Sequence, residues 1–310
     1  MNSNYRYIYG PVSSRRFGWS LGVDLTPYKT CSLDCVFCQL GRTRYKTIER
    51  KEYVTTGAVL AEIKNWIETD GDADVVTLSG SGEPTLHAGF GKVLENLKQY
   101  SISTVLLTNG TLLDIAEVRE AAIMADIVKV SLSAWNQSSF EWLNRPHSGL
   151  AFNRLKEGIK RFRSKFKGQL WIEVFLVMGI NSMEAVVEKI AAAVKEVKPN
   201  RIHLNTAVRP PAENFVVALP VERIKKLTCL FDPPAEIISE INIHSSKKIQ
   251  ADENGILAML QRRPSTMKQI ELTFSLHINE VSKYLGNLMR KDYIRTYFKN
   301  GKVYYGKKFG

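Results

Sequence analysis

The sequence predicts an α/β fold: a partial (βα)6 TIM-like barrel followed by a small C-terminal winged-helix domain. Short β-branched or apolar runs alternate with segments of helical period six times between about residues 20 and 207. Such alternation predicts a parallel sheet that is buried on both faces. The last sixty residues then show three helical patterns and a hairpin signal. We therefore expect a barrel domain over residues 1–243 and a winged-helix domain over residues 253–310, with a polar linker from His244 to Glu253 between them.

Six segments have the composition of buried strands, and helical repeats such as Val59, Ile63 and Ile67 separate them. In a barrel of this kind the functional groups lie at the C-terminal ends of the strands. After the last strand, Pro220 precedes a helical segment, Val221 to Leu230, that is expected to cap the barrel. The six expected strands are Leu21–Leu25, Asp74–Leu78, Thr104–Leu107, Ile127–Leu132, Trp171–Val177 and Ile202–Leu204.

The C-terminal segment begins with a helical pattern at Ile256 to Leu260, and Ser265 is placed to cap a second helix starting at Thr266. A third apolar stripe recurs at three- and four-residue steps from Ile278 to Met289. An Asn-Gly pair at 300–301 then separates two short β-type runs, which predicts a hairpin. Three helices and a hairpin follow one another in this order in a winged helix. A packing or dimerisation module is the alternative.

Charge is unevenly distributed along the 310 residues. The formal net charge is +12, and thirteen basic against five acidic side chains after residue 244 supply +8 of it. This excess indicates an anionic partner for the C-terminal segment, and a basic surface kept for solubility is the alternative. No run of about 18 apolar residues could cross a bilayer, so we expect a cytoplasmic protein with no membrane partner.

Three of the four cysteines, Cys31, Cys35 and Cys38, have the spacing C-x3-C-x2-C after the first expected strand. A [4Fe-4S] cube has four irons, so three thiolates leave one iron open to another ligand. Structural zinc is the competing interpretation, with Cys229 or a histidine as its fourth ligand. Cys229 is otherwise expected to be a buried apolar residue of its helix.

Several segments around these cysteines resemble the radical S-adenosylmethionine (SAM) superfamily. Within it they resemble the Fe-S oxidoreductases similar to the tRNA wyosine-base synthases. The resemblance covers most of the chain from Tyr9 to Glu213, although the additional cysteines with which the wyosine synthases hold a second cluster are missing here. The matching segments are Tyr9–Val12, Ser14–Arg16, Ser20–Leu25, the cysteine motif and Gln39–Thr43.

The resemblance implies a [4Fe-4S] cluster on the three cysteines and SAM as the second cofactor. Reductive cleavage of SAM would give a 5′-deoxyadenosyl radical. Glu83, in a glycine-rich segment, would hydrogen-bond the amino group of SAM, and a carboxylate suits an ammonium. Arg209 and Asn205 would face the same rim, where Arg209 could bind an anionic substrate group. No catalytic residue is assigned. The expected SAM-binding residues are Phe37, Gly80, Ser81, Gly82, Glu83, Asn109, Ser131 and Ser133.

Three hypotheses for the partner of this chemistry remain open. The enzyme could modify RNA, specifically a tRNA base, and dock it through the basic winged helix. It could instead modify or activate a peptide or protein. Third, the protein could be a regulator that senses through its cluster and binds DNA. The first two require an electron donor such as ferredoxin or flavodoxin.

Overall fold

The computed structural model describes residues 5–14, 16–69, 71–238, 252–299 and 301–307. Most of the expected linker and the end of the expected barrel domain lie outside these ranges. Eight strands form one sheet in the order β1-β2-β5-β6-β7-β8-β9-β10, in which β1 is antiparallel to β2 and the other neighbours are parallel. The strands are β1 (Ile8–Ser14), β2 (Gly18–Val23), β5 (Val75–Leu78), β6 (Ser103–Thr108), β7 (Ile127–Ser131), β8 (Gln169–Leu176), β9 (Arg201–Thr206) and β10 (Glu236–Ile237).

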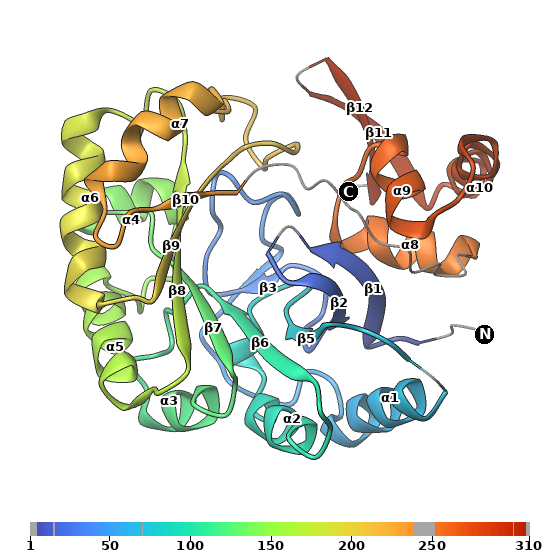
Figure 1. Ribbon diagram of the computed structural model, residues 1–310, viewed down its shortest axis with the longest axis horizontal. Coiled ribbons are helices and arrows are strands. Elements are labelled where there is room, and N and C mark those ends of the chain that lie inside the picture. Colours follow the sequence, from blue (N-terminus) through green and yellow to red (C-terminus); the bar gives the residue numbers. More distant parts are fainter. Residues whose placement is uncertain (1–4, 15, 70, 239–251, 300, 308–310) are drawn as a thin grey trace.

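Five helices form an arc around the outer face of this sheet (Figure 1). They bury apolar side chains against it, for example Val59 and Ile63 of α1 and Phe162 of α5, all fully buried. The five are α1 (Thr56–Glu68), α2 (Phe90–Leu97), α3 (Ala116–Ala122), α5 (Phe152–Lys165) and α6 (Glu184–Val197). The connections add η1 (Pro84–Leu86), α4 (Gln137–Asn144), α7 (Val221–Leu227), η2 (Thr228–Leu230) and the short strands β3 (Thr30–Cys31) and β4 (Tyr45–Lys46).

All six expected strands are present, with ends shifted by up to three residues. The mixed α/β class with a parallel sheet is therefore confirmed. The sequence prediction missed β1 and β10 of this sheet and the short pair β3 and β4. Strand β1 contains Pro11, which cannot donate a ladder hydrogen bond, and it lies at the sheet edge, where proline is tolerated.

Side chains inside the curve of the sheet form layers. At the N-terminal ends of the strands, Val75, Val105 and Trp171 pack against Phe17 from the β1–β2 connection. The Phe17 and Trp171 rings stack with their centroids 5.1 Å apart. This apolar layer closes the interior at the end of the sheet opposite the cysteines.

Residues 252–307, called the C-terminal unit below, have a core of their own. The expected order is confirmed: α8 (Glu253–Arg262), α9 (Met267–Phe274), α10 (Ile278–Arg290), β11 (Ile294–Lys299) and β12 (Lys302–Lys307). The predicted cap is wrong by one residue. Thr266 caps α9 through a capping box with Gln269, whereas Ser265 exchanges backbone hydrogen bonds with Tyr305.

The C-terminal unit packs against the edge of the sheet, where α8 contacts β1 (Figure 1). The Tyr304 hydroxyl donates to the Val208 carbonyl at 2.7 Å, and the Lys307 ammonium lies 3.8 Å from the centre of the Tyr28 ring. No helix among the described residues is long and apolar enough to span a bilayer.

His203 of β9 is buried, and its stability contribution should depend on pH. Burial, followed by the nearby charges of Arg16, Lys129 and Arg201, lowers its pKa from 6.5 to about 3, although Glu236 lies 3.8 Å from Nε2. Above pH 6.5 the imidazole is neutral in the folded and unfolded chains. As the pH falls below 6.5, only the unfolded chain takes up the proton, so we expect a loss of about 1–2 kcal/mol by pH 5.

Urea unfolding of the wild type and His203→Gln at pH 7.5 and pH 5 measures this loss. The variant, whose side chain does not titrate, should lose less stability on acidification than the wild type. Equal losses in the two proteins would contradict the prediction.

Candidate active site

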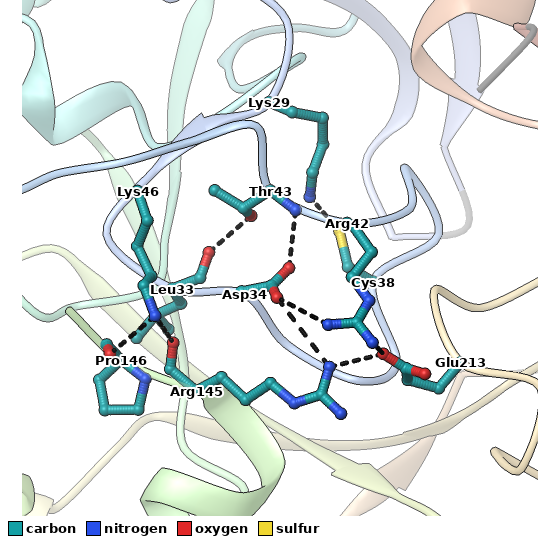
Figure 2. Close-up of polar contacts among 10 residues, drawn as sticks. All are labelled: Lys29, Leu33, Asp34, Cys38, Arg42, Thr43, Lys46, Arg145, Pro146 and Glu213. Carbon is teal, nitrogen blue, oxygen red and sulfur yellow. Dashed lines mark hydrogen bonds and ion pairs between the residues drawn. The ribbon is translucent and has the colours of Figure 1, made fainter. Parts of the chain in front are cut away.

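The three cysteines lie in the segment of residues 29–47, called the cysteine loop, which follows β2. Two carboxylates brace this loop (Figure 2). Asp34 accepts from the Thr43 amide at 2.6 Å and pairs with Arg42. Glu213, which follows β9, pairs with Arg42 at 2.6 Å and with Arg145 at 2.5 Å. The loop is thereby tied to elements that lie more than 100 residues away in the sequence.

Backbone hydrogen bonds join the same loop to the end of α4. The Asp34 amide donates to the Asn144 carbonyl at 2.9 Å, and the Val36 amide donates to the Leu143 carbonyl at 3.0 Å. The last carbonyls of a helix have no partner within it, and here the loop supplies their donors. Arg145 ends the helix in the left-handed conformation. The cysteine loop is therefore held along its backbone as well as by ion pairs.

Each cysteine sulfur accepts a hydrogen bond from a nitrogen outside the motif. One donor is an ammonium, which is 3% exposed, and the other two are side-chain amides. The pairs are Asn109 Nδ2 to Cys31 Sγ at 3.5 Å, Asn144 Nδ2 to Cys35 Sγ at 3.2 Å and Lys29 Nζ to Cys38 Sγ at 3.2 Å. Donors and a positive charge around sulfur favour thiolates and tune a bound cluster.

Two of these sulfurs, those of Cys31 and Cys35, are so deeply buried that they need a positive centre such as a bound iron to be ionised. Burial and the nearby Glu83 raise the pKa of the Cys31 thiol to about 12, and burial also raises that of Cys35. No three His, Cys, Asp or Glu side chains among the described residues are arranged to share one metal ion. A cube differs from a single ion because each thiolate binds a different iron. Three separate sulfurs, each with a hydrogen-bond donor of its own, are a donor set that fits such a cube.

Cys229 does not join this group. Its thiol is exposed on η2, where it donates to the Lys226 carbonyl at 3.4 Å. The prediction that Cys229 is buried was wrong because the helix ends at Leu227, and the short η2 turn that follows presents no buried side chain.

The glycine-rich segment Ser79–Thr85 follows β5 and passes directly over the cysteine loop. A Cβ atom on Gly82 would lie 1.9 Å from the Thr30 carbonyl oxygen, and Gly80 has φ +121°. Ser81 is buried, and its amide and hydroxyl both donate to Asp24. Glycine is thus needed at these two positions for close approach and for backbone conformation.

Glu83 is 2% exposed, and its carboxylate is surrounded by donors. Oε1 accepts from the Thr85 amide at 3.1 Å, the Thr85 hydroxyl at 2.6 Å and the Thr108 hydroxyl at 2.6 Å. Oε2 accepts from the Asn109 amide at 2.7 Å. Glu83 therefore links the ends of β5 and β6 and positions Asn109, which in turn donates to Cys31.

A cavity of about 380 Å³, called the central cavity below, opens between the cysteine loop and the interior of the sheet. Of the expected SAM-binding residues, Phe37, Gly80 and Gly82 line it, and the Phe37 ring stacks on Phe175 with centroids 4.3 Å apart. Asn205 and Arg209, expected at the rim, also line it.

Of the two serines expected at the cofactor site, Ser131 is the last residue of β7 and Ser133 lies two residues beyond the strand. Ser131 ends the strand two residues after Lys129, which lines the cavity, so both side chains face the interior. The Ser133 hydroxyl instead accepts from the Phe175 amide at 2.8 Å. Ser133 therefore holds the ring that lines the cavity.

A second cavity of about 400 Å³ lies between the cysteine loop and the hairpin β11–β12. Its lining combines aromatic and cationic side chains, and Phe298 is 77% exposed. The residues of this kind are Tyr28, Arg42, Arg44, Tyr297, Phe298 and Lys299.

Sequence reasoning missed the partners that come from distant segments. Lys29 and Asn144, donors to two of the cysteines, belong to no motif that was recognised. Arg262 of α8 pairs with Asp24 at 2.8 Å, a contact between residues 238 apart. A charged residue inside a strand expected to be buried was a usable signal, because a buried charge needs a partner of opposite charge. Lys129 and Glu173 are such a pair.

Residues 25–194 match the Radical SAM superfamily. The chain is 34% identical over 307 residues to a protein of Brachyspira hyodysenteriae named GTPase Obg, with 96% of this chain covered. It spans only 45% of the length of that relative. A UPF0026 protein of Methanocaldococcus jannaschii is 32% identical over 314 residues, which covers 96% of this chain and 95% of the relative.

Two solved structures share the fold. A radical SAM methyltransferase from Sphaerobacter thermophilus superposes with a TM-score of 0.52 at 18% identity, covering 70% of this chain and 66% of its own. TYW1 with a lysine-pyruvate adduct bound superposes with a TM-score of 0.51 at 17% identity, covering 73% of this chain and 76% of its own.

Proposed function

Because the chain belongs to the radical SAM superfamily and to the UPF0026 family, we propose that it cleaves SAM reductively at a [4Fe-4S] cluster held by Cys31, Cys35 and Cys38. Members of the superfamily are Fe-S oxidoreductases that bind this cluster and SAM. When bound, the cluster supplies the electron that breaks the 5′-carbon–sulfur bond of SAM, giving methionine and a 5′-deoxyadenosyl radical. The observation that carries the proposal is the hydrogen-bond donor beside each cysteine sulfur, together with the cavity of about 380 Å³ that Cys38 lines.

The expected SAM-binding residues divide into two roles in this proposal. Phe37, Gly80, Gly82 and Ser131 border the SAM site directly. The others act as positioning residues, because their polar groups are engaged inside the protein; these are Ser81, Glu83, Asn109 and Ser133. A low-potential ferredoxin or flavodoxin is the proposed electron donor.

For the substrate, the proposal is an RNA, docked by the C-terminal unit acting as a winged-helix domain. The unit is basic and packs beside the cysteine loop. The cavity between the two combines cations with aromatic rings such as Phe298, a combination that suits phosphates and unstacked bases. A peptide or protein substrate is the alternative outcome of the tests below.

Cofactor cleavage is tested by reconstituting the full-length protein anaerobically with iron and sulfide, reducing it with dithionite and adding SAM. Formation of 5′-deoxyadenosine in an amount that rises with the cluster content is the expected result. A fully loaded, reduced protein that forms none would overturn the proposal.

RNA docking is tested separately by measuring the binding of bulk tRNA at several salt concentrations. Affinity should fall as salt rises, and Arg44→Gln should reduce the slope of log affinity against log salt by about one. Lys189→Gln, an exposed charge on α6, is the control and should change nothing. Absent or salt-insensitive binding, with retained cleavage of SAM, would favour a peptide or protein substrate.

Lys29 should raise the reduction potential of the cluster. Its ammonium donates to Cys38 Sγ, and a positive charge there stabilises the more negative, reduced state. Lys29→Met is therefore expected to lower the midpoint potential by roughly 50–100 mV, from one charge at close range. Redox titration followed by electron paramagnetic resonance measures the shift. Lys51→Met, an exposed lysine that pairs with Glu49, is the control, and equal potentials in the wild type and Lys29→Met would contradict this role.

A further inference from the structure

A patch of exposed apolar side chains lies beside the cysteine loop, at the end of α4. The rings of Trp142 and Phe215 have their centroids 5.6 Å apart. Phe215 and Val217 flank Val216, which is fully buried. The Val217 carbonyl accepts from the Met178 amide at 3.1 Å. Apolar side chains gathered at a surface mark an interaction site, unlike ones scattered singly. The four residues called the apolar patch below, each 44–48% exposed, are Trp142, Phe215, Val217 and Met178.

Both halves of the apolar patch are tied to Val36, the residue that follows the second cysteine of the motif. The Val36 amide donates to the Leu143 carbonyl at 3.0 Å, and Leu143 follows Trp142 in α4. The Val36 carbonyl accepts from the Glu213 amide at 3.1 Å, two residues before Phe215. Val36 and Leu143 also belong to one buried apolar cluster. One backbone hydrogen bond on each side therefore connects the patch to the cysteine motif.

The same end of α4 reaches a cysteine sulfur. Asn144, two residues after Trp142, donates from Nδ2 to Cys35 Sγ at 3.2 Å. The rate at which an electron crosses a protein falls steeply with distance, so a cluster on the cysteines needs a nearby surface at which a donor can bind. None of the four patch residues is among the described residues that line the two cavities. A donor on the apolar patch therefore leaves both cavities free for SAM and the substrate.

Two lysines stand at the border of the apolar patch. The Lys46 ammonium donates to the carbonyls of Arg145 and Pro146 at 3.3 Å, just beyond the end of α4 (Figure 2). The Lys299 ammonium of the hairpin donates to the Val216 carbonyl at 2.9 Å. Neither lysine is paired with a carboxylate of the described residues. The charges of both ammonium groups are thus available to a partner.

The other charges of this border are largely balanced. Arg42 and Arg145 both pair with Glu213. Asp34 lies within 4.0 Å of the same two arginines. Glu141, the neighbour of the patch in α4, is exposed and is the acid that opposes the two lysines. The border therefore carries a net positive charge, which favours an acidic partner and speeds its association.

We propose that the apolar patch docks an acidic flavodoxin, which delivers the electron for the cluster across the hydrogen bonds to Val36. The inference rests on the proposed function, because it names the partner that reduces the cluster proposed there. One electron leaves the reduced flavin and enters the oxidised cluster, and no bond forms or breaks. The apolar edge of a flavin ring suits contact with Trp142 and Phe215. Acidic groups around that edge then face Lys46 and Lys299.

Docking is measured with the full-length, cluster-loaded protein and a purified acidic bacterial flavodoxin. Titration with the oxidised flavodoxin, which transfers no electron, yields a Kd by calorimetry. Trp142→Ser should weaken binding at least about tenfold, because it removes the largest ring of the patch. Trp142→Phe, which keeps a ring, should retain most of the affinity. Leu272→Ser, which removes an exposed apolar side chain of α9, is the control and should leave the Kd unchanged.

A stopped-flow measurement separates docking from the properties of the cluster. Reduction by subsaturating reduced flavodoxin should slow about tenfold in Trp142→Ser, in step with the Kd. Reduction by dithionite, which needs no docking surface, should keep the wild-type rate. Lys46→Gln should slow reduction by flavodoxin at low salt and lose this effect at high salt, because salt screens the charge. Phe215→Ser should repeat the loss of binding, and it decides if Trp142→Ser does not fold.

The same Kd for flavodoxin in the wild type and Trp142→Ser would overturn the proposal, as would an equal loss in Leu272→Ser. If Trp142→Ser loses affinity for bulk tRNA and keeps its affinity for flavodoxin, the patch belongs to RNA and the proposal is likewise overturned. Neither assay contains SAM, so the two proposals fail separately. Docking without 5′-deoxyadenosine once SAM is added would remove only the proposed cleavage. Formation of 5′-deoxyadenosine with dithionite by a protein that binds no flavodoxin would remove only the docking site.

Discussion

Replacing Cys35 with alanine is expected to yield a protein that holds almost no iron-sulfur cluster after reconstitution. The wild type should contain about four irons per chain and show the broad absorption of a [4Fe-4S] cube. With two thiolates left, two irons lack a protein ligand, and the cube cannot be retained. Iron and acid-labile sulfide content, together with the absorption spectrum, measure the loss, and cleavage of SAM should disappear with them.

Cys229→Ala is the matched control for this experiment, because it removes a thiol that is exposed on η2 and lies outside the cysteine loop. Its iron content should equal that of the wild type. Full iron content in Cys35→Ala, or a marked loss in Cys229→Ala, would show that the cluster is not held as proposed.

Glu83→Ala should destabilise the fold more than other single substitutions at the site. The buried carboxylate accepts two backbone amides and two hydroxyls, and its removal leaves these donors without an acceptor in the interior. We expect a loss of about 3–5 kcal/mol in the free energy of unfolding, from unsatisfied buried groups. Urea denaturation of the cluster-free protein, followed by circular dichroism, measures it.

Glu83→Gln keeps one acceptor oxygen at nearly the same position and serves as the comparison. Its loss should be smaller, about 1–2 kcal/mol, because only part of the network is left without a partner. A Glu83→Ala protein that unfolds at the wild-type urea concentration would show that the carboxylate does not hold the ends of β5 and β6 together.

The parts of the fold that sequence predicts well are those in which local pattern and tertiary burial agree. Segments such as Thr104–Leu107 are apolar or β-branched along their whole length, as is typical of strands buried on both faces, and all six were found. The edge strand β1 has no such pattern because, among the described residues, one of its edges has no neighbouring strand, and because Pro11 interrupts it. Strand β10 has two residues, too few to show any period.

The candidate site divides in the same way. The cysteine spacing and the glycine-rich segment are local, so they can be read along the chain. The donors to the sulfurs cannot, since Asn109 and Asn144 reach Cys31 and Cys35 across 78 and 109 residues. The roles expected for Ser81 and Ser133 show the same limit: which way a small polar side chain turns depends on acceptors and donors supplied by other strands, here Asp24 and the Phe175 amide.

The contact of Arg262 with Asp24 has a mechanical consequence. Asp24 also holds Ser81, so a single carboxylate joins α8 to the glycine-rich segment that passes over the cysteines. Any rotation of α8 away from the sheet must break the bond to Asp24 or pull that carboxylate with it. The glycine-rich segment beside the cysteine loop is thus coupled to α8, and a displacement of α8 is transmitted through Asp24 to that segment.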